Sequence, residues 1–201
     1  MKFILASGNA HKKEEYEDLL SPHTVEIVEG FDADETGTTY KENARIKLNA
    51  LDEFLKKQGK FDTLSPSDIL FADDSGLEIE SHREILGLYT SRFMSDVGAT
   101  QSQKNDKIIK IMKTADNRNA RFVCHIAFKK VKSDEILDVE GEIKGIIADS
   151  QDGDGGFGYD PIFIPNGESE TLSKLGSKYK REHSHRANAL SLMLKVLEQY
   201  N

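Results

Sequence analysis

The segment Phe71–Gly76, with the sequence FADDSG, carries the most distinctive chemistry of the chain. Two adjacent carboxylates, Asp73 and Asp74, follow an apolar run that is typical of the end of a buried strand. Neighbouring carboxylates repel each other and lose solvation on burial, so such a pair needs a cation. Mg²⁺ prefers oxygen ligands and commonly binds one or two carboxylates plus substrate phosphates. The pattern favours a magnesium site, and a solvated turn built on aspartate is the alternative.

A second segment, Ser7–Lys12 (SGNAHK), lies where a strand is expected to turn into a helix. Its glycine lets the backbone approach a ligand closely, and a helix N-terminus offers free N–H groups. Lys12 adds a positive charge. These features suit a phosphate, although the spacing is not that of a Walker A loop. A plain tight turn with a surface lysine is the competing interpretation.

A third segment runs from Glu35 through a threonine-rich loop into a predicted helix. Glu35 lies just before this helix, where it can supply another carboxylate to a metal. Thr39 and Glu42 have the spacing of a capping box. Asn43 and Lys47 are four residues apart and therefore share one face of the helix. That face borders the apolar stripe, so the two side chains can point into a cleft, or they form an ordinary surface pair.

The fourth segment is the glycine-rich stretch Gly155–Pro161 (GGFGYDP). An aromatic ring flanked by glycines is free of backbone crowding and can stack on a planar base; a packed aromatic in a hairpin loop is the alternative. Downstream, basic residues gather before a final helix, and they are Lys174, Lys178, Lys180, Arg181, His183, His185 and Arg186. Together the four segments indicate a site for a base, a triphosphate and a hard cation.

The composition excludes several classes of protein. The chain has 201 residues and a formal net charge of −8, which argues against non-specific nucleic-acid binding because that depends on a basic surface. No run approaches the ~20 apolar residues of a membrane helix, and the opening apolar run is too short for a signal peptide. The single cysteine, Cys124, cannot form an intramolecular disulfide. We therefore expect a cytoplasmic protein with no membrane or nucleic-acid partner.

Hydrophobic periodicity and turn residues predict the elements that position these segments. Strands are expected at residues 2–7, 24–28, 69–72, 77–80, 121–131 and 135–147, helices at 11–20, behind Thr39, at 100–113 and at 185–199, and a loop at 149–158. Strands that alternate with helices favour an α/β fold, and the hairpin formed by the last two strands implies a mixed central sheet with flanking helices.

The motifs, in their order along the chain, resemble those of the inosine triphosphate pyrophosphatase family, also called Ham1-like or noncanonical purine NTP pyrophosphatases. The resemblance rests on Ser7–Lys12, on Glu35-Thr36-Gly37 with Glu42-Asn43-Ala44 and Lys47, on Ala72–Leu77, on Gly155–Pro161 and on Ser184-His185-Arg186. It implies one domain over residues 1–201, with two lobes around an active-site cleft. It also implies hydrolysis of ITP, dITP and XTP to the monophosphate and pyrophosphate, and a homodimer.

The resemblance also assigns roles to residues. Asp74 is expected to accept the proton of the attacking water and to bind one Mg²⁺ ion per subunit with Glu35, while Asp73 and Lys47 support this centre. The phosphates are expected to contact Ser7, Gly8, Asn9, Ala10, His11 and Lys12. The expected contacts of the rest of the substrate are Ser75, Phe157 stacked on the base, Gly158, Tyr159, Asp160, Lys180, and His185 and Arg186 at the 6-oxo group. An arginine donor there would reject the amino group of adenine.

The chain departs from the family pattern after the aspartate motif. Residues 82–92 (HREILGLYTSR) keep the length of the family's G-G-x-P-G-x-Y-S-A-R segment but lack its glycine pair and proline. The family associates this segment with the dimer, so the departure bears on oligomer geometry more than on chemistry. Two alternatives to the expected activity are a Maf-like nucleotide pyrophosphatase and a nucleotide-binding sensor without catalysis. The Phe157 loop argues against the first, and the paired aspartates argue against the second.

Overall fold

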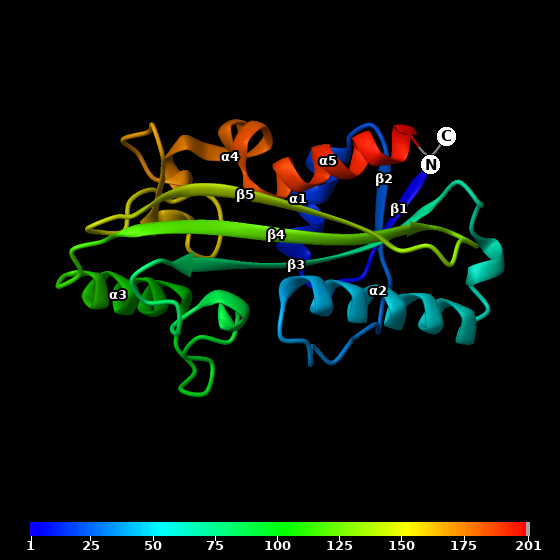
Figure 1. Ribbon diagram of the computed structural model, residues 1–201, viewed down its shortest axis with the longest axis horizontal. Coiled ribbons are helices and arrows are strands. Elements are labelled where there is room, and N and C mark those ends of the chain that lie inside the picture. The colour runs from blue at the N-terminus through cyan, green and yellow to red at the C-terminus, as the bar shows by residue number, and fades with distance from the viewer. Residues whose placement is uncertain (200–201) are drawn as a thin grey trace. The chain divides into compact units, whose positions relative to one another are not determined.

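The computed structural model describes residues 1–199 and shows an α/β fold (Figure 1). The strands are β1 (Lys2–Leu5), β2 (Thr24–Ile27), β3 (Ile69–Ile79), β4 (Asn119–Lys130), β5 (Leu137–Ile147) and β6 (Phe163–Pro165), and the helices are α1 (Ala10–Leu20), α2 (Tyr40–Lys57), α3 (Gln101–Met112), α4 (Leu172–His183) and α5 (His185–Gln199). Within the described residues, no helix has the length and apolar character needed to cross a membrane.

The strands form one sheet in the order β2-β1-β3-β4-β5-β6. Strand β1 is parallel to both β2 and β3, with Phe3 opposite Val25 on one side and Ile69 on the other. Strand β6 is antiparallel to β5, with Ile146 opposite Ile164. The predicted mixed sheet is therefore confirmed.

The chain separates into two compact units. Unit 1 comprises residues 1–74, 124–141 and 189–201, and unit 2 comprises residues 75–123 and 142–188. The long strands β3, β4 and β5 each contribute residues to both units.

Unit 1 buries apolar side chains on both faces of its part of the sheet. Helix α2 covers one face, and α1 and α5 cover the other (Figure 1). Leu48 of α2 packs in one core cluster with Ala127 of β4, whereas Tyr16 of α1 packs in another with Ile126. Because successive side chains of a strand point to opposite faces of the sheet, Ile126 and Ala127 pack on the sides covered by different helices. This explains why β4 reads as a continuous apolar run in the sequence.

Unit 2 has its own core. Ile108 and Met112 of α3 pack with Leu77 of β3 and Phe122 of β4, and all four side chains are less than one tenth exposed. Tyr159, from the glycine-rich loop, belongs to the same cluster. The loop is therefore fixed to the core of unit 2 by one of its own side chains.

The main error of the sequence prediction concerns β3. Strands were predicted at 69–72 and 77–80 with a break at the aspartates, but β3 runs continuously from Ile69 to Ile79. Asp73 and Asp74 thus lie in the interior of a strand and not at its end. Polar residues and Gly76 suggested a break, yet pairing inside a sheet overrides such local preferences.

Two further elements were not predicted, α4 and the short β6. Gly176 in α4 has φ +77 and interrupts the helical geometry, and the sequence around it is highly charged. Both features hide helical periodicity. The other predicted helices are confirmed, with ends shifted by a few residues at most, and Thr39 is the N-cap of α2 as expected.

Candidate active site

Unit 1 gathers three acidic side chains and two lysines, which we call the carboxylate cluster. Its members are Glu35, Asp73 and Asp74, with Lys12 and Lys47 as their cations. They come from the start of α1, the loop before α2, α2 itself and β3. The structure therefore brings together residues from three of the four segments that the sequence singled out.

Asp73 and Lys12 form a buried ion pair. Lys12 Nζ lies 2.9 Å from both Asp73 Oδ1 and Asp73 Oδ2, and the side chain of Asp73 is fully buried. The thiol of Cys124 lies 3.8 Å from Asp73 Oδ2. A buried carboxylate is tolerated only when it is paired in this way. Lys12 thus compensates the charge of Asp73, and its own side chain is 14% exposed.

Asp74 receives a donor on each carboxylate oxygen. Lys47 Nζ lies 3.2 Å from Oδ1, and the amide of Asn43 donates to Oδ2 at 3.0 Å. Burial raises the pKa of the Asp74 carboxyl, although Lys47, Asn43 and Lys12 act in the opposite direction. A carboxylate with a raised pKa holds a proton more readily than an exposed one, which is the property of a general base.

Lys47 links the two acids expected to bind the metal. Its Nζ lies 2.9 Å from Glu35 Oε1 and 3.2 Å from Asp74 Oδ1. Burial alone lowers the pKa of Lys47, but the nearby carboxylates, Asp73 first among them, outweigh burial and raise that pKa. Lys47 is therefore a fixed positive charge in the cluster. Glu35 and Asp74 therefore contact the same ammonium group although they are far apart in sequence.

The cluster does not form a metal cage of protein ligands alone. Within residues 1–199, no group of three or more His, Cys, Asp and Glu side chains is arranged to hold a metal ion. Magnesium commonly needs fewer protein ligands, because waters and substrate phosphates complete its shell. Two hard oxygen donors converging from Glu35 and Asp74 fit that mode of binding.

The Ser7–Lys12 segment forms the N-terminus of α1. Asn9 is the N-cap, and its side-chain oxygen accepts from the backbone N–H of His11 at 3.0 Å and of Lys12 at 3.3 Å. Two of the free N–H groups that the sequence offered to a phosphate are thus used in capping. Gly8 has open space around the position of a Cβ. Gly8 to His11 are exposed, so a ligand can reach this turn.

Unit 2 positions the aromatic residue of the glycine-rich loop beside two cations, which we call the aromatic-loop cluster. Lys180 Nζ lies 4.9 Å from the centre of the Phe157 ring, and Arg186 Cζ lies 5.4 Å from it. Both distances are within the range of cation–π contacts. The structure therefore brings Phe157, Lys180 and Arg186 together in unit 2.

Asp160 fixes the shape of this loop. Its Oδ2 accepts from the backbone N–H of Phe157 at 2.9 Å and from Lys180 Nζ at 2.8 Å. Gly156 has φ +74, and a Cβ at that position would lie 2.3 Å from Asp160 Oδ2. Only glycine accepts this backbone conformation together with this close approach. Asp160 thus places both the aromatic ring and the lysine.

Ser75, His185 and Arg186 also belong to unit 2. Arg186 Nη2 donates to Ser75 Oγ at 2.9 Å, and Arg186 is only 4% exposed. The ring of His185 stacks on Phe122 with a centroid distance of 4.9 Å and an interplanar angle of 15°. These contacts give both side chains defined orientations, which recognition of a base edge requires.

The remaining predicted loop residues have structural contacts. Tyr159 is 4% exposed, donates to the carbonyl of Thr90 at 3.1 Å, and has its pKa raised by burial to about 12. The carbonyl of Gly158 accepts from Asn105 Nδ2 at 3.2 Å. Asn105 is 1% exposed and was not singled out from the sequence. A lone polar residue on the apolar side of a predicted helix was the available signal.

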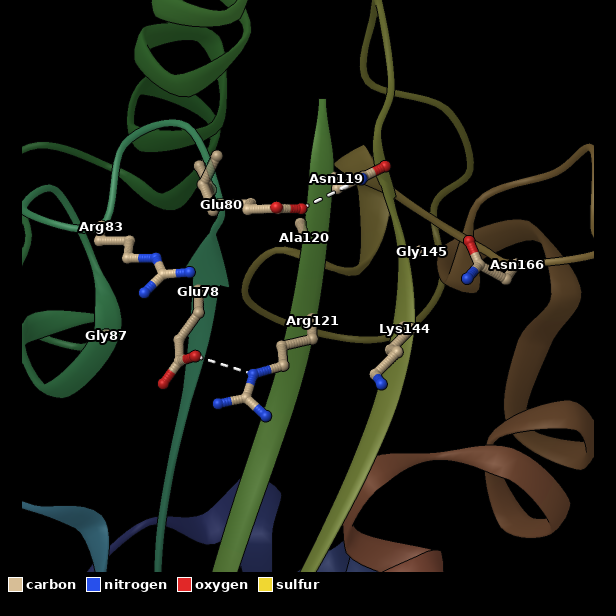
Figure 2. Close-up of a pocket in the computed structure, with 11 residues that line it drawn as sticks. Glu78, Glu80, Arg83, Gly87, Asn119, Ala120, Arg121, Lys144, Gly145 and Asn166 are labelled. Atoms are coloured by element: carbon tan, nitrogen blue, oxygen red, sulfur yellow. Dashed lines mark hydrogen bonds and ion pairs between the residues drawn. The ribbon is translucent and has the colours of Figure 1, made fainter. Parts of the chain in front are cut away.

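A separate pocket of about 640 Å³ lies over the sheet of unit 2 (Figure 2). Among its charged side chains, Glu78, Arg121 and Lys144 form ion pairs. Arg121 Nε donates to Glu78 at 2.8 Å, and Asn119 Nδ2 donates to Glu80 at 3.0 Å. None of the site residues predicted from the sequence lines this pocket. It is therefore distinct from the two clusters described above.

Comparison with known proteins agrees with this arrangement. The profile of the Ham1 family matches residues 3–196. The dITP/XTP pyrophosphatase of Acholeplasma laidlawii is 40% identical, over 99% of this chain and 94% of that protein. The corresponding protein of Bacillus subtilis is 34% identical, over 97% and 96%. The Ham1 protein structure from Staphylococcus aureus superposes with a TM-score of 0.81 at 30% identity, covering 100% of both chains.

The Asp160–Lys180 pair generates the first testable prediction. Replacing Asp160 with Asn leaves the largely buried ammonium of Lys180 without its counter-charge. We therefore expect the free energy of unfolding to fall by about 2 kcal/mol. Asp149→Asn is the matched control, because Asp149 is in the same loop region and 96% exposed, so its ion pair adds little. Urea unfolding at neutral pH measures both. Equal midpoints for the two variants would contradict the role given to Asp160.

Proposed function

The chain belongs to the Ham1 family, and from that premise we propose that it hydrolyses noncanonical purine nucleoside triphosphates to the monophosphate and pyrophosphate. The substrates are ITP, dITP and XTP. Relatives named dITP/XTP pyrophosphatase match over nearly their whole length. The observation that carries the proposal is the buried carboxylate of Asp74, which accepts hydrogen bonds from Asn43 and Lys47. Such an arrangement suits hydrolysis at a polyanionic phosphate.

The carboxylate cluster supplies groups for each part of this reaction. Asp74 accepts a proton from the attacking water, because burial makes its carboxylate more basic than usual. Lys12 and the exposed turn before it contact the phosphates. The positive charge of Lys12 stabilises the negative charge that grows on the leaving pyrophosphate. Lys47 and Asp73 hold these groups in place.

Magnesium fits the same cluster. Glu35 and Asp74 would hold one ion per subunit through oxygen atoms, in the manner typical of this cation. The ion would supply Lewis-acid polarisation of the phosphoryl oxygens. Lys47 contacts both acids and so helps to orient their carboxylates.

The aromatic-loop cluster suits the purine. Phe157 offers a ring for stacking, and Gly158, Tyr159 and Asp160 shape the loop that carries it. Arg186, with His185 beside it in the sequence, donates to a 6-oxo group. Adenine presents an amino donor there, so ATP is rejected by two donors facing each other.

We also propose that the protein acts as a homodimer. Tyr89 and Val97 are 62% and 68% exposed. Tyr89 lies in the segment 82–92, which departs from the family pattern. Both side chains would be removed from water if they lay in the interface of a dimer. Light scattering on the purified protein is expected to give twice the chain mass of 22.5 kDa, and Tyr89→Ser with Val97→Ser is expected to lower it. A monomer at all concentrations would contradict this proposal.

The substrate proposal predicts a defined pattern of pyrophosphate release. XTP, ITP and dITP are expected to be cleaved rapidly with magnesium, whereas ATP is cleaved slowly, and removal of the metal abolishes release from all. Coupled detection of pyrophosphate measures each rate. Equal cleavage of ATP and ITP would overturn the role of Arg186. Binding of XTP without any release would favour a sensor.

Asp74→Asn tests the proposed base. An amide does not accept a proton at neutral pH, so we expect turnover to fall about 100- to 10,000-fold, the usual contribution of a general base, while the fold is retained. Asp62→Asn is the control, because Asp62 is exposed and outside both clusters. Circular dichroism checks the fold of each variant. Near-normal turnover by Asp74→Asn would show that another group accepts the proton.

A further inference from the structure

We propose that Asn43 is a positioning residue that locks the Asp74 carboxylate to the loop that carries Glu35. This role rests on the proposed hydrolysis and explains how its base is held. The side-chain amide of Asn43 donates to Asp74 Oδ2 at 3.0 Å, and its Oδ1 accepts from the backbone N–H of Gly37 at 2.8 Å. Asn43 is 4% exposed, and its bond to Asp74 is buried while its bond to Gly37 is partly buried.

The two bonds define the amide orientation without ambiguity. The backbone N–H of Gly37 can only donate, so the oxygen of Asn43 must face it. The nitrogen then faces Asp74, whose ionised carboxylate can only accept. Both ends of the side chain are therefore matched to their partners.

Asn43 and Lys47 divide the task of holding Asp74. They lie four residues apart on α2, so they project from the same face of the helix. Each donates to a different oxygen of the carboxylate, which fixes the rotation of that group about its own axis. Lys47 supplies charge and also contacts Glu35. Asn43 orients the carboxylate of Asp74 without adding charge. Its side chain also reaches the backbone of Gly37, two residues after Glu35.

The close approach at Gly37 supports the same role. A Cβ at Gly37 would lie 2.7 Å from Asn43 Oδ1 and 2.7 Å from Glu42 Cβ. A methyl group there would push the amide away from its present position. The loop therefore approaches α2 as closely as glycine permits, and the contact that it makes there is to Asn43.

No similar residue meets both requirements. Aspartate can accept from Gly37 but cannot donate to Asp74 when ionised, and it adds a repelling charge. Alanine meets neither partner, so a buried carboxylate oxygen of Asp74 and the partly buried N–H group of Gly37 lose their hydrogen bonds to this side chain. A loss of orientation at a catalytic carboxylate lowers the rate of reaction more than it weakens substrate binding.

The experiment compares Asn43→Ala with Asn105→Ala, using XTP as the substrate. Both remove a buried asparagine that makes two or more side-chain bonds, but Asn105 holds the loop of Phe157. For Asn43→Ala we expect kcat to fall about 10–100-fold, as for other residues that orient a ligand or base, with KM changed less than about threefold. For Asn105→Ala we expect mainly KM to rise. A kcat of Asn43→Ala within threefold of wild type overturns the proposal.

A second variant guards against a general loss of structure. Gly37→Ala displaces the same amide from the other side, so its loss of kcat and that of Asn43→Ala should not add in the double variant. Additive losses would show that the two residues act separately and would overturn the proposal. Thermal melting of each variant verifies that the fold persists.

A readout independent of turnover completes the test. The side-chain amide resonance of Asn43, identified by its loss in Asn43→Ala, is expected to move in Asp74→Asn and to stay in place in Asp62→Asn. An unmoved resonance in Asp74→Asn would overturn the contact itself. Normal turnover by both wild type and Asn43→Ala would reject this inference and leave the proposed function standing. Absence of turnover in the wild type would reject both.

Discussion

Burial of two adjacent carboxylates in the interior of a strand is the constraint on which unit 1 depends. Asp73 and Asp74 are 1% and 8% exposed and point to opposite faces of β3, as neighbours on a strand must. An ionised carboxylate in such a place requires a counter-charge and hydrogen bonds. The structure provides a different lysine for each, Lys12 from α1 and Lys47 from α2. Both helices are therefore bound to the strand by electrostatics as well as by apolar packing.

Unit 2 holds the aromatic ring of a loop in a fixed position beside two cations, which come from α4 and α5. Loops are mobile unless their backbone groups find partners. Here Asp160 receives both the Phe157 N–H and the Lys180 ammonium, and Tyr159 anchors the loop in the core. The glycines allow the tight backbone path, and the bulky residues between them supply the anchors. Preorganisation of this kind lowers the entropy lost when a ligand binds.

Local signals predicted much of the fold because they act over a few residues. Thr39 begins α2 because its Oγ1 accepts from the N–H of Glu42, at 3.1 Å. The reciprocal half of the capping box is displaced by one residue, since Glu42 Oε2 accepts from the N–H of Thr38 at 2.7 Å and not from that of Thr39. In β3, by contrast, the polar pattern predicted a break that the neighbouring strands prevented. Turn-forming residues decide the local structure only where no ladder of hydrogen bonds competes.

The sequence by itself determined the chemical inventory of the protein: the paired acids, the lysine after a glycine turn, the aromatic flanked by glycines, and the α/β pattern. These are properties of residue type and short spacing, which the chain displays directly. Only the tertiary structure decided which groups face each other. It joined Lys12 to Asp73, Lys47 to both Glu35 and Asp74, and Asn43 to Asp74 across 31 positions of sequence. Such partners are chosen by packing between distant elements, and hydrogen bonds over that separation leave no periodic trace in a sequence.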